Sequence, residues 1–173
     1  MREFTKISPT LWASKRFTSL GSDDPKFLFL YFLTSEHQNS AGIFRLRDEY
    51  AIADLEWEMT RYQTAREDLV AAKLIRFDVE TSTILILDWF RHNAPMNDSH
   101  YKGVVRAIQR IDCVAFRLEA LEALQEAYEA KKDGRPPRAP QKSESPSGDV
   151  LAASASDVSP ALKAHLARQR LDA

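Results

Sequence analysis

The sequence predicts a mainly helical α+β domain, and this prediction rests on three patterns within residues 41–92. Apolar and charged residues alternate over 43–47, as in a half-buried strand. Apolar residues recur at spacings of three and four over 62–72, as on one face of a helix. Two β-branched, apolar runs within 76–87 flank a polar turn and indicate a hairpin. With a short helix at 50–55, the order strand, helix, helix, hairpin is typical of a winged helix-turn-helix.

The segment before this region mixes apolar and basic side chains. We expect Leu11, Trp12 and Phe17 to pack on the domain. Lys15 and Arg16 are expected to stay exposed near the first helix.

A helix is expected over 26–34, because the residues before it are typical of a helix start. Ser22 can act as the N-cap, the two following aspartates suit the positive end of the helix dipole, and Pro25 is tolerated in the first turn. Since the helix is apolar nearly all round, it should form the buried centre of the core.

The predicted helix-turn-helix has its own start and turn signals. Asp48 is an N-cap or a first-turn acid, and Glu56-Trp57 makes the turn. Thr60 is a plausible cap for the second helix, although Glu58 or Met59 could begin it. The face expected to pack on the core carries Tyr62, Ala65, Leu69 and Ala72, and the opposite face carries Thr60, Arg61, Gln63, Thr64, Glu67 and Asp68.

After the hairpin, which Trp89-Phe90 is expected to close, two more helices are predicted. The first runs from about His100 to Ile111 and is capped by Asp98 or Ser99. Lys102, Arg106 and Arg110 repeat every four residues along it, a pattern that suits phosphates, an acidic partner or an ordinary solvated face. The second helix, 114–132, is amphipathic and packs back on the domain or pairs with another copy, so a homodimer is left open.

The composition changes near the end of this helix. We predict a winged-helix domain with appended helices over 1–133, a flexible linker over 134–158, and a short C-terminal helix or tail over 159–173. The linker is rich in proline, serine and alanine, and the last segment is short, basic and amphipathic. A tethered segment of this kind is a common form of partner-binding motif.

Composition narrows the functional classes. The single cysteine, Cys113, excludes an internal disulfide, and no run approaches the roughly 20 apolar residues of a membrane helix, so we expect a reducing cytoplasm and no membrane contact. Glycine-rich phosphate loops, nucleophile elbows and zinc-ligand spacings are missing, so we expect no enzyme, no catalytic residue, no cofactor and no metal. His92, Asp98 and His100 match no familiar metal motif.

Charge is the main argument against nucleic-acid binding. The chain has a net charge of −1, and DNA-binding domains usually carry a basic excess for phosphate contacts. Within 41–92 there are 7 Lys/Arg and 10 Asp/Glu, whereas residues 1–47 hold 7 basic and 4 acidic side chains. Any DNA contact should therefore use local basic positions.

The second helix nevertheless offers side chains that can read DNA in the major groove. Arg61 can contact guanine with two hydrogen bonds, and Gln63 can pair with adenine. Thr60 and Thr64 can reach a phosphate or a thymine methyl group. The hairpin tip, Thr81-Ser82-Thr83, lacks lysine or arginine and should be a weak wing. The basic candidates for further contacts are Arg66, Arg76, Lys15, Arg16, Lys102, Arg106 and Arg110.

Over roughly residues 4–125 the chain resembles phage and prophage replication-initiation (replisome organiser) winged-helix proteins. The resemblance rests on the order and spacing of RxFTKISPTLWASKRFTSL, DDPKFLFLYFLTSEHQNSAGIFRL, LVAAKLIRFD, LILDWFRHNAPMN and KGVVRAIQRI. It implies sequence-specific binding of double-stranded origin DNA, and recruitment of a replicative helicase or loader through other segments, such as the C-terminal tail. It also implies the cytoplasm or nucleoid of a bacterial host as the location. The DNA-facing positions would be Thr60, Arg61, Gln63 and Thr64. The chain departs from the family in having Lys73 where such helices often end in glycine.

Two other functions remain open. A transcriptional regulator can use the same fold. A winged helix can also serve as a protein-interaction module with little affinity for DNA, and the acidic balance favours that alternative.

Overall fold

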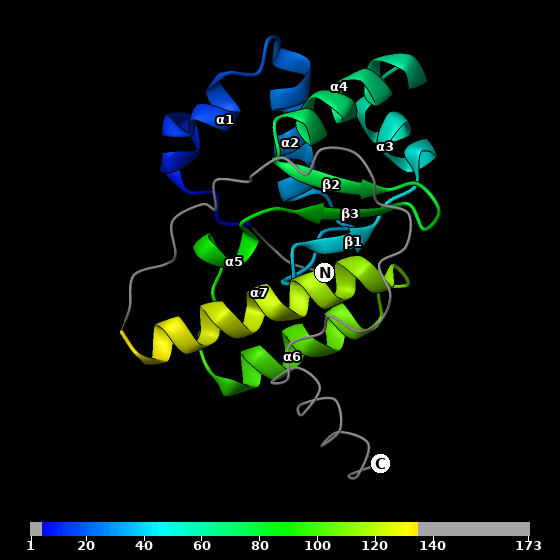
Figure 1. Cartoon of the computed structure of the whole chain (residues 1–173). Coiled ribbons are helices and arrows are strands. Elements are labelled where there is room, and N and C mark those ends of the chain that lie inside the picture. Colours follow the sequence, from blue (N-terminus) through cyan, green and yellow to red (C-terminus); the bar gives the residue numbers. More distant parts are fainter. Residues whose placement is uncertain (1–4, 135–173) are drawn as a thin grey trace, which may run out of the picture. The chain divides into compact units, whose positions relative to one another are not determined.

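A small antiparallel sheet lies between two groups of helices (Figure 1). The computed structural model describes residues 5–134, so the predicted linker beyond Gly134 and the predicted segment 159–173 lie outside the described residues. The elements follow the order η1 (Pro9–Ala13), α1 (Lys15–Thr18), α2 (Asp23–Thr34), β1 (Ile43–Arg45), α3 (Asp48–Leu55), α4 (Met59–Ala71), β2 (Ile75–Asp78), β3 (Thr83–Ile86), α5 (Trp89–His92), α6 (Asp98–Gln109) and α7 (Val114–Lys132). The mainly helical α+β class is confirmed.

The sheet has the strand order β1-β3-β2, with both pairs antiparallel. Every residue of the central strand β3 is buried, so both faces of the sheet are covered. Neighbouring side chains on β2 show what covers them, because successive side chains of a strand point to opposite faces. Phe77 contacts Arg66 of α4, whereas Arg76 contacts Glu119 of α7. Helices α4 and α7 therefore lie on opposite faces.

Helix α2 supplies the centre of the core, although it is not buried all round. Phe32 is fully buried and makes edge-on contacts with Phe44 of β1 and Tyr62 of α4, each at 6.5 Å between ring centroids. Phe27, in contrast, is 55% exposed. The sequence of this helix is apolar nearly throughout, so it did not indicate which side is exposed. Periodicity locates the buried face of a helix only where polar residues mark the exposed face. In the first segment, Phe17 is likewise fully buried but Trp12 is 63% exposed.

The turn between α3 and α4 is closed by backbone hydrogen bonds. Glu56 adopts the left-handed conformation, with φ 53°, and the Trp57 amide donates to the Ile52 carbonyl at 3.1 Å. Glu58 is the N-cap of α4, so the helix begins at Met59, one of the predicted starts. Asp48 lies in the first turn of α3 and does not cap it.

The second strand of the hairpin ends earlier than expected, at Ile86. Trp89 and Phe90 were predicted to close the second strand, but they belong to the short helix α5. Asp88 takes a left-handed φ of 57°, which ends the strand direction. The Trp89 ring can then pack over Gly42, and its Nε1 donates to the Ser40 carbonyl at 2.9 Å. The start of α6 also differs, because the side chain of Asn97 caps it by accepting from the His100 amide.

The buried hydroxyl of Tyr62 leads to a prediction about alkaline stability. Burial raises the pKa of Tyr62 from 10.0 to about 12. Because the pKa is raised, the phenol loses its proton at a lower pH in the unfolded chain than in the folded chain. The contribution of neutral Tyr62 to the free energy of unfolding is therefore complete below about pH 10 and is lost as the pH rises toward 12. Tyr62→Phe should therefore reduce the loss of stability between pH 9 and pH 11.

At neutral pH this variant should lie within about 1 kcal/mol of the wild type, because the hydroxyl is buried without a hydrogen-bond partner in the described structure. Urea unfolding at several pH values measures both effects. The exposed Tyr50 supplies the control, since Tyr50→Phe should follow the wild-type curve. If Tyr62→Phe also followed the wild-type curve, the buried phenol would not be the cause of the loss of stability at alkaline pH.

Candidate nucleic-acid interface

Helix α4 is held against α2, α3 and β2 and leaves one polar face outside. Tyr62, Ala65 and Leu69 are buried, as their spacing predicted, and Ala72 is partly buried. The outer face carries the exposed residues Thr60, Arg61, Gln63, Thr64, Glu67 and Asp68. Four of these are the predicted base-reading positions, so the fold places them together on one accessible helix face.

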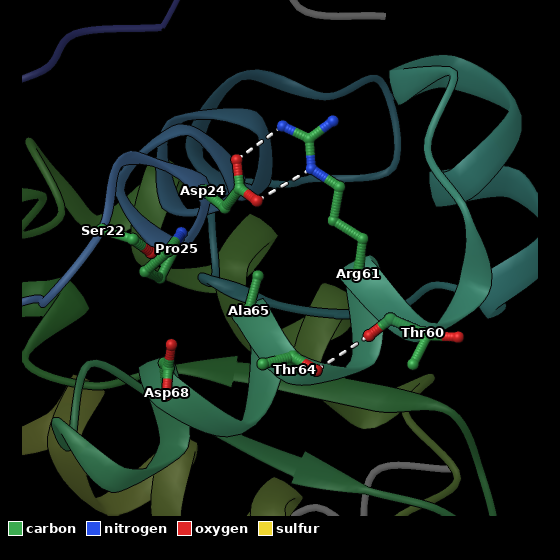
Figure 2. A pocket seen from close by; sticks show the side chains of 8 residues that line it. All are labelled: Ser22, Asp24, Pro25, Thr60, Arg61, Thr64, Ala65 and Asp68. Atoms are coloured by element: carbon green, nitrogen blue, oxygen red, sulfur yellow. Dashed lines mark hydrogen bonds and ion pairs between the residues drawn. The ribbon is translucent and has the colours of Figure 1, made fainter.

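Arg61 is accessible but already engaged (Figure 2). Its Nε and Nη2 donate to the two carboxylate oxygens of Asp24 on α2, at 2.8 and 2.5 Å. The guanidinium also lies 4.2 Å from the centroid of the Trp57 ring. The hydrogen bond from Arg61 lowers the pKa of the Asp24 carboxyl, so the pair is ionised at neutral pH. Its charge is therefore balanced within the protein.

A shallow hollow of about 260 Å³ lies beside this ion pair, between the start of α2 and the exposed side of α4 (Figure 2). Its floor includes Pro25 and Ala65, and the carboxylates of Asp24 and Asp68 flank it. Within it the Thr64 hydroxyl donates to the Thr60 carbonyl at 2.9 Å. Arg61 also lines the hollow, but it is already paired with Asp24, and Asp68 adds a negative charge. The hollow therefore does not suit a phosphate group, and phosphates would have to be bound elsewhere.

Arg66 belongs to the core. The residue is 8% exposed, and its guanidinium forms an ion pair with Asp48 of α3. It also lies 3.8 Å from the centroid of the Phe77 ring on β2 and 5.1 Å from that of Tyr62. The predicted contact of Arg66 with the DNA backbone is therefore corrected: the buried side chain joins α3, α4 and β2.

Arg16 and Arg76 are each paired with a distant carboxylate. Arg16 forms an ion pair with Asp88 and donates to the Lys73 carbonyl at 2.8 Å. Arg76 forms an ion pair with Glu119, and its guanidinium lies 4.7 Å from the Phe116 ring centroid. Because Arg76 points toward α7, it lies on the sheet face opposite α4. It cannot extend the surface of α4.

The hairpin tip is closed by its own hydrogen bonds. The Asp78 carboxylate accepts from the Thr81 amide at 3.0 Å and from the Thr81 hydroxyl. Thr83 is only 1% exposed, so it is not available as a wing residue. The outermost side chains are Val79, which is 76% exposed, and Glu80. This tip offers no cation to a DNA backbone.

The remaining basic candidates are exposed and lie in two places. Lys15 is on α1, Lys102 and Arg106 lie on α6, and Arg110 is the C-cap of α6. Local sequence patterns did not predict the carboxylates that neutralise the arginines, because Asp24, Asp48, Asp88 and Glu119 are 18 to 72 residues from their partners. Trp57 was likewise not predicted as a partner of Arg61. Only the acidic balance of residues 41–92 hinted at such pairing.

No protein-family model, curated protein or solved structure matches the chain. Among residues 5–134 no group of three or more His, Cys, Asp or Glu side chains is placed to hold a metal ion. Asp98 accepts a hydrogen bond from the Tyr128 hydroxyl, and Nδ1 of His100 accepts from the Met96 amide at 3.2 Å. No helix in this described range is long and apolar enough to cross a membrane.

Proposed function

We propose that the chain is a winged helix-turn-helix protein that binds double-stranded DNA in phage or prophage replication initiation. The order and pairing of the elements support this. Helix α2, strand β1, helices α3 and α4, and the hairpin β2–β3 follow one another, and β1 pairs with β3. In this arrangement α4 is the recognition helix and the hairpin is the wing. The replication role rests on the resemblance of residues 4–125.

The proposal depends mainly on the exposed face of α4, whose side chains can contact base edges. Gln63 can donate to N7 and accept from N6 of adenine, and Thr60 and Thr64 on the same face are short enough to let the helix approach the base edges. Such contacts give sequence preference, whereas affinity for DNA comes largely from phosphates. The acidic Glu67 and Asp68 on this face should keep non-specific affinity low.

Arg61 reaches a guanine only by exchanging its carboxylate partner. In the free protein Asp24 holds both sides of the guanidinium, so the exchange replaces two hydrogen bonds with two others. Asp24 then acts as a selector, because DNA that offers no guanine at this position leaves the ion pair intact. Removing the carboxylate should make Arg61 available to any phosphate.

We expect Arg61→Ala and Gln63→Ala each to weaken binding to the preferred duplex roughly ten-fold or more, since a good bidentate base contact is worth about 1–3 kcal/mol. Asp24→Asn should strengthen binding to random-sequence duplex, and the difference in affinity between the preferred duplex and the random duplex should become smaller. Fluorescence anisotropy of the full chain, with fragments of the source replicon's origin and with random duplex of equal length, measures these effects at two salt concentrations.

Gln125→Ala is the matched control, because Gln125 lies on α7, which covers the other face of the sheet, and should bind DNA like the wild type. Absence of saturable binding to any duplex at low salt would rule out the proposal. Unchanged sequence preference in Arg61→Ala and Gln63→Ala would show that α4 is not the reading helix.

A protein-interaction module is the second candidate, and the charge of the α4 face favours it. The only cation on that exposed face, Arg61, is neutralised by Asp24, while Glu67 and Asp68 remain. Binding of the chain to the purified host helicase or loader, with no binding to DNA, would support this candidate. If the chain binds origin DNA and also the helicase, and loses only the helicase when residues 135–173 are removed, the replication proposal is supported.

A further inference from the structure

Helix α6 presents an exposed basic face. Its apolar side, with Val104, Val105 and Ile108, is buried, and a stacked Tyr101–Tyr128 pair at 4.4 Å joins the helix to α7. At about 100° of rotation per residue, the outer residues fall within an arc of roughly 100°. This face, the α6 face, consists of Ser99, Lys102, Gly103, Arg106 and Arg110, all of them exposed.

The cations of the α6 face differ from the other arginines of the proposed interface. Arg16, Arg61, Arg66 and Arg76 each have a carboxylate partner. Within residues 5–134, the side chains of Arg106 and Arg110 form no ion pair or hydrogen bond, and Lys102 acts on Asp98 through charge alone. Asp98 lies in the first turn of α6, and Asp112 follows the end of the helix. The charges along its centre are therefore available to an anionic partner.

Gly103 on this face also indicates a binding surface, independently of the charges. Glycine in a helix interior destabilises the helix relative to alanine. Nothing lies within 4 Å of the position that a Cβ would occupy, so packing within the protein does not require glycine there. A missing side chain between Lys102 and Arg106 lets a partner's surface approach the helix backbone. A row of cations about 6 Å apart beside a serine and a glycine suits a phosphate backbone better than an acidic protein surface.

The α6 face and the recognition face of α4 cannot contact the same stretch of straight duplex. Helix α4 covers one face of the sheet, through Arg66 and Phe77, and α7 covers the other, through Glu119 and Arg76. Helix α6 packs on α7, and the strands lie between the two helix groups (Figure 1). DNA on the α6 face must therefore be another segment.

We propose that the α6 face binds the phosphate backbone of a second duplex segment, without sequence preference, so that one chain can bridge two DNA segments. This inference rests on the proposed DNA-binding function and assigns it a second surface. Lys102, Arg106 and Arg110 neutralise phosphates, and Ser99 and Gly103 allow close approach. Sequence preference stays with α4.

The test uses the full chain and three sets of variants. The neutral variant is Lys102→Gln/Arg106→Gln/Arg110→Gln, and the matched control, Arg106→Lys/Arg110→Lys, keeps the charge. Anisotropy with a short random duplex over a range of salt gives the slope of log K against log salt. A second assay asks whether protein on a bead-tethered duplex captures a free, labelled duplex. Gly103→Ala supplies a steric probe in both assays.

We expect the wild type to bind the short random duplex through the α6 face with a slope of about −2.7, from three phosphates at about 0.9 each, and the neutral variant to lose this binding. It should also lose capture of the second duplex while keeping the sequence preference of the wild type. The control should retain slope and capture. Gly103→Ala should melt at a higher temperature than the wild type and yet capture less duplex.

Wild-type slope and capture in the neutral variant would overturn the inference and leave binding through α4 intact. That is the result expected if the α6 face serves an acidic protein or if two copies of the chain bridge the duplexes by themselves. Absence of binding of the wild type to every duplex would overturn the proposed function as well. Loss of all binding in the neutral variant, with unchanged behaviour of Gln63→Ala, would leave the α6 face as the DNA site and overturn α4.

Discussion

Gly42→Ala should lower the free energy of unfolding by roughly 2–6 kcal/mol, the sum of two separate costs. Gly42 has a φ of +67°, and a non-glycine residue in such a conformation costs roughly 1–3 kcal/mol. A Cβ there would lie 2.2 Å from Cγ of Trp89, and forcing extra atoms into a packed site costs about 1–3 kcal/mol.

Neither cost can be relieved easily. The Trp89 ring is 5% exposed and is fixed by the hydrogen bond from its Nε1 to the Ser40 carbonyl. The Gly42 carbonyl accepts from the Ile86 amide at 2.9 Å, so moving the backbone would disturb the pairing of β1 with β3. The contact between the start of β1 and α5 therefore accepts only glycine.

Denaturant unfolding followed by circular dichroism measures this loss. Gly103→Ala is the comparison, because it lies in a helix with nothing within 4 Å of the new methyl group and should stabilise the protein by about 0.5–1 kcal/mol. We expect the free energy of unfolding to fall in Gly42→Ala and to rise in Gly103→Ala. A small effect at Gly42 would mean that the Trp89 ring is not fixed over it.

Arg66→Ala should also destabilise the protein by about 3 kcal/mol, because removing one partner of a buried ion pair leaves the other charge without compensation. The side chains of Arg66 and Asp48 are 10% and 20% exposed. The substitution also removes the guanidinium stacked 3.8 Å from the centre of the Phe77 ring. Helices α3 and α4 and strand β2 would lose their common contact.

A double-mutant cycle separates these effects. Removing both charges with Arg66→Met and Asp48→Ala should cost less than the sum of the single losses, because no unpaired charge remains. The exposed pair Arg61–Asp24 supplies the control, and Arg61→Ala should leave the free energy of unfolding nearly unchanged. Additive losses at Arg66 and Asp48 would contradict the assignment of Arg66 to a buried ion pair.

The contrast between Arg61 and Arg66 also bears on function. Both lie on α4 and both pair with an aspartate, yet one ion pair is exposed and the other is buried. We expect Arg61→Ala to change DNA binding without changing stability, and Arg66→Ala to do the reverse. Measuring both properties on both variants tests the site and the fold together.

Local patterns in the sequence predicted most of the elements correctly. The helix at 114–132 has the predicted bounds, and the buried side of α4 carries Tyr62, Ala65 and Leu69. These predictions succeed because amphipathic spacing and turn residues act over a few positions along the chain. They fail where neighbours along the chain do not decide the structure, as at Trp89, whose position depends on the space above Gly42.

The sequence by itself thus determined the α+β class, the order of most of the elements, and the set of polar side chains on the outer face of α4. Only the tertiary structure decided which cations are available, since ion pairs form between residues that folding brings together from distant parts of the chain. It placed Arg66 inside, gave carboxylate partners to Arg16, Arg61 and Arg76, and left Arg106 and Arg110 of the described residues unpaired on α6. A charged side chain's role depends on its burial and its nearest opposite charge, and both are properties of the folded chain.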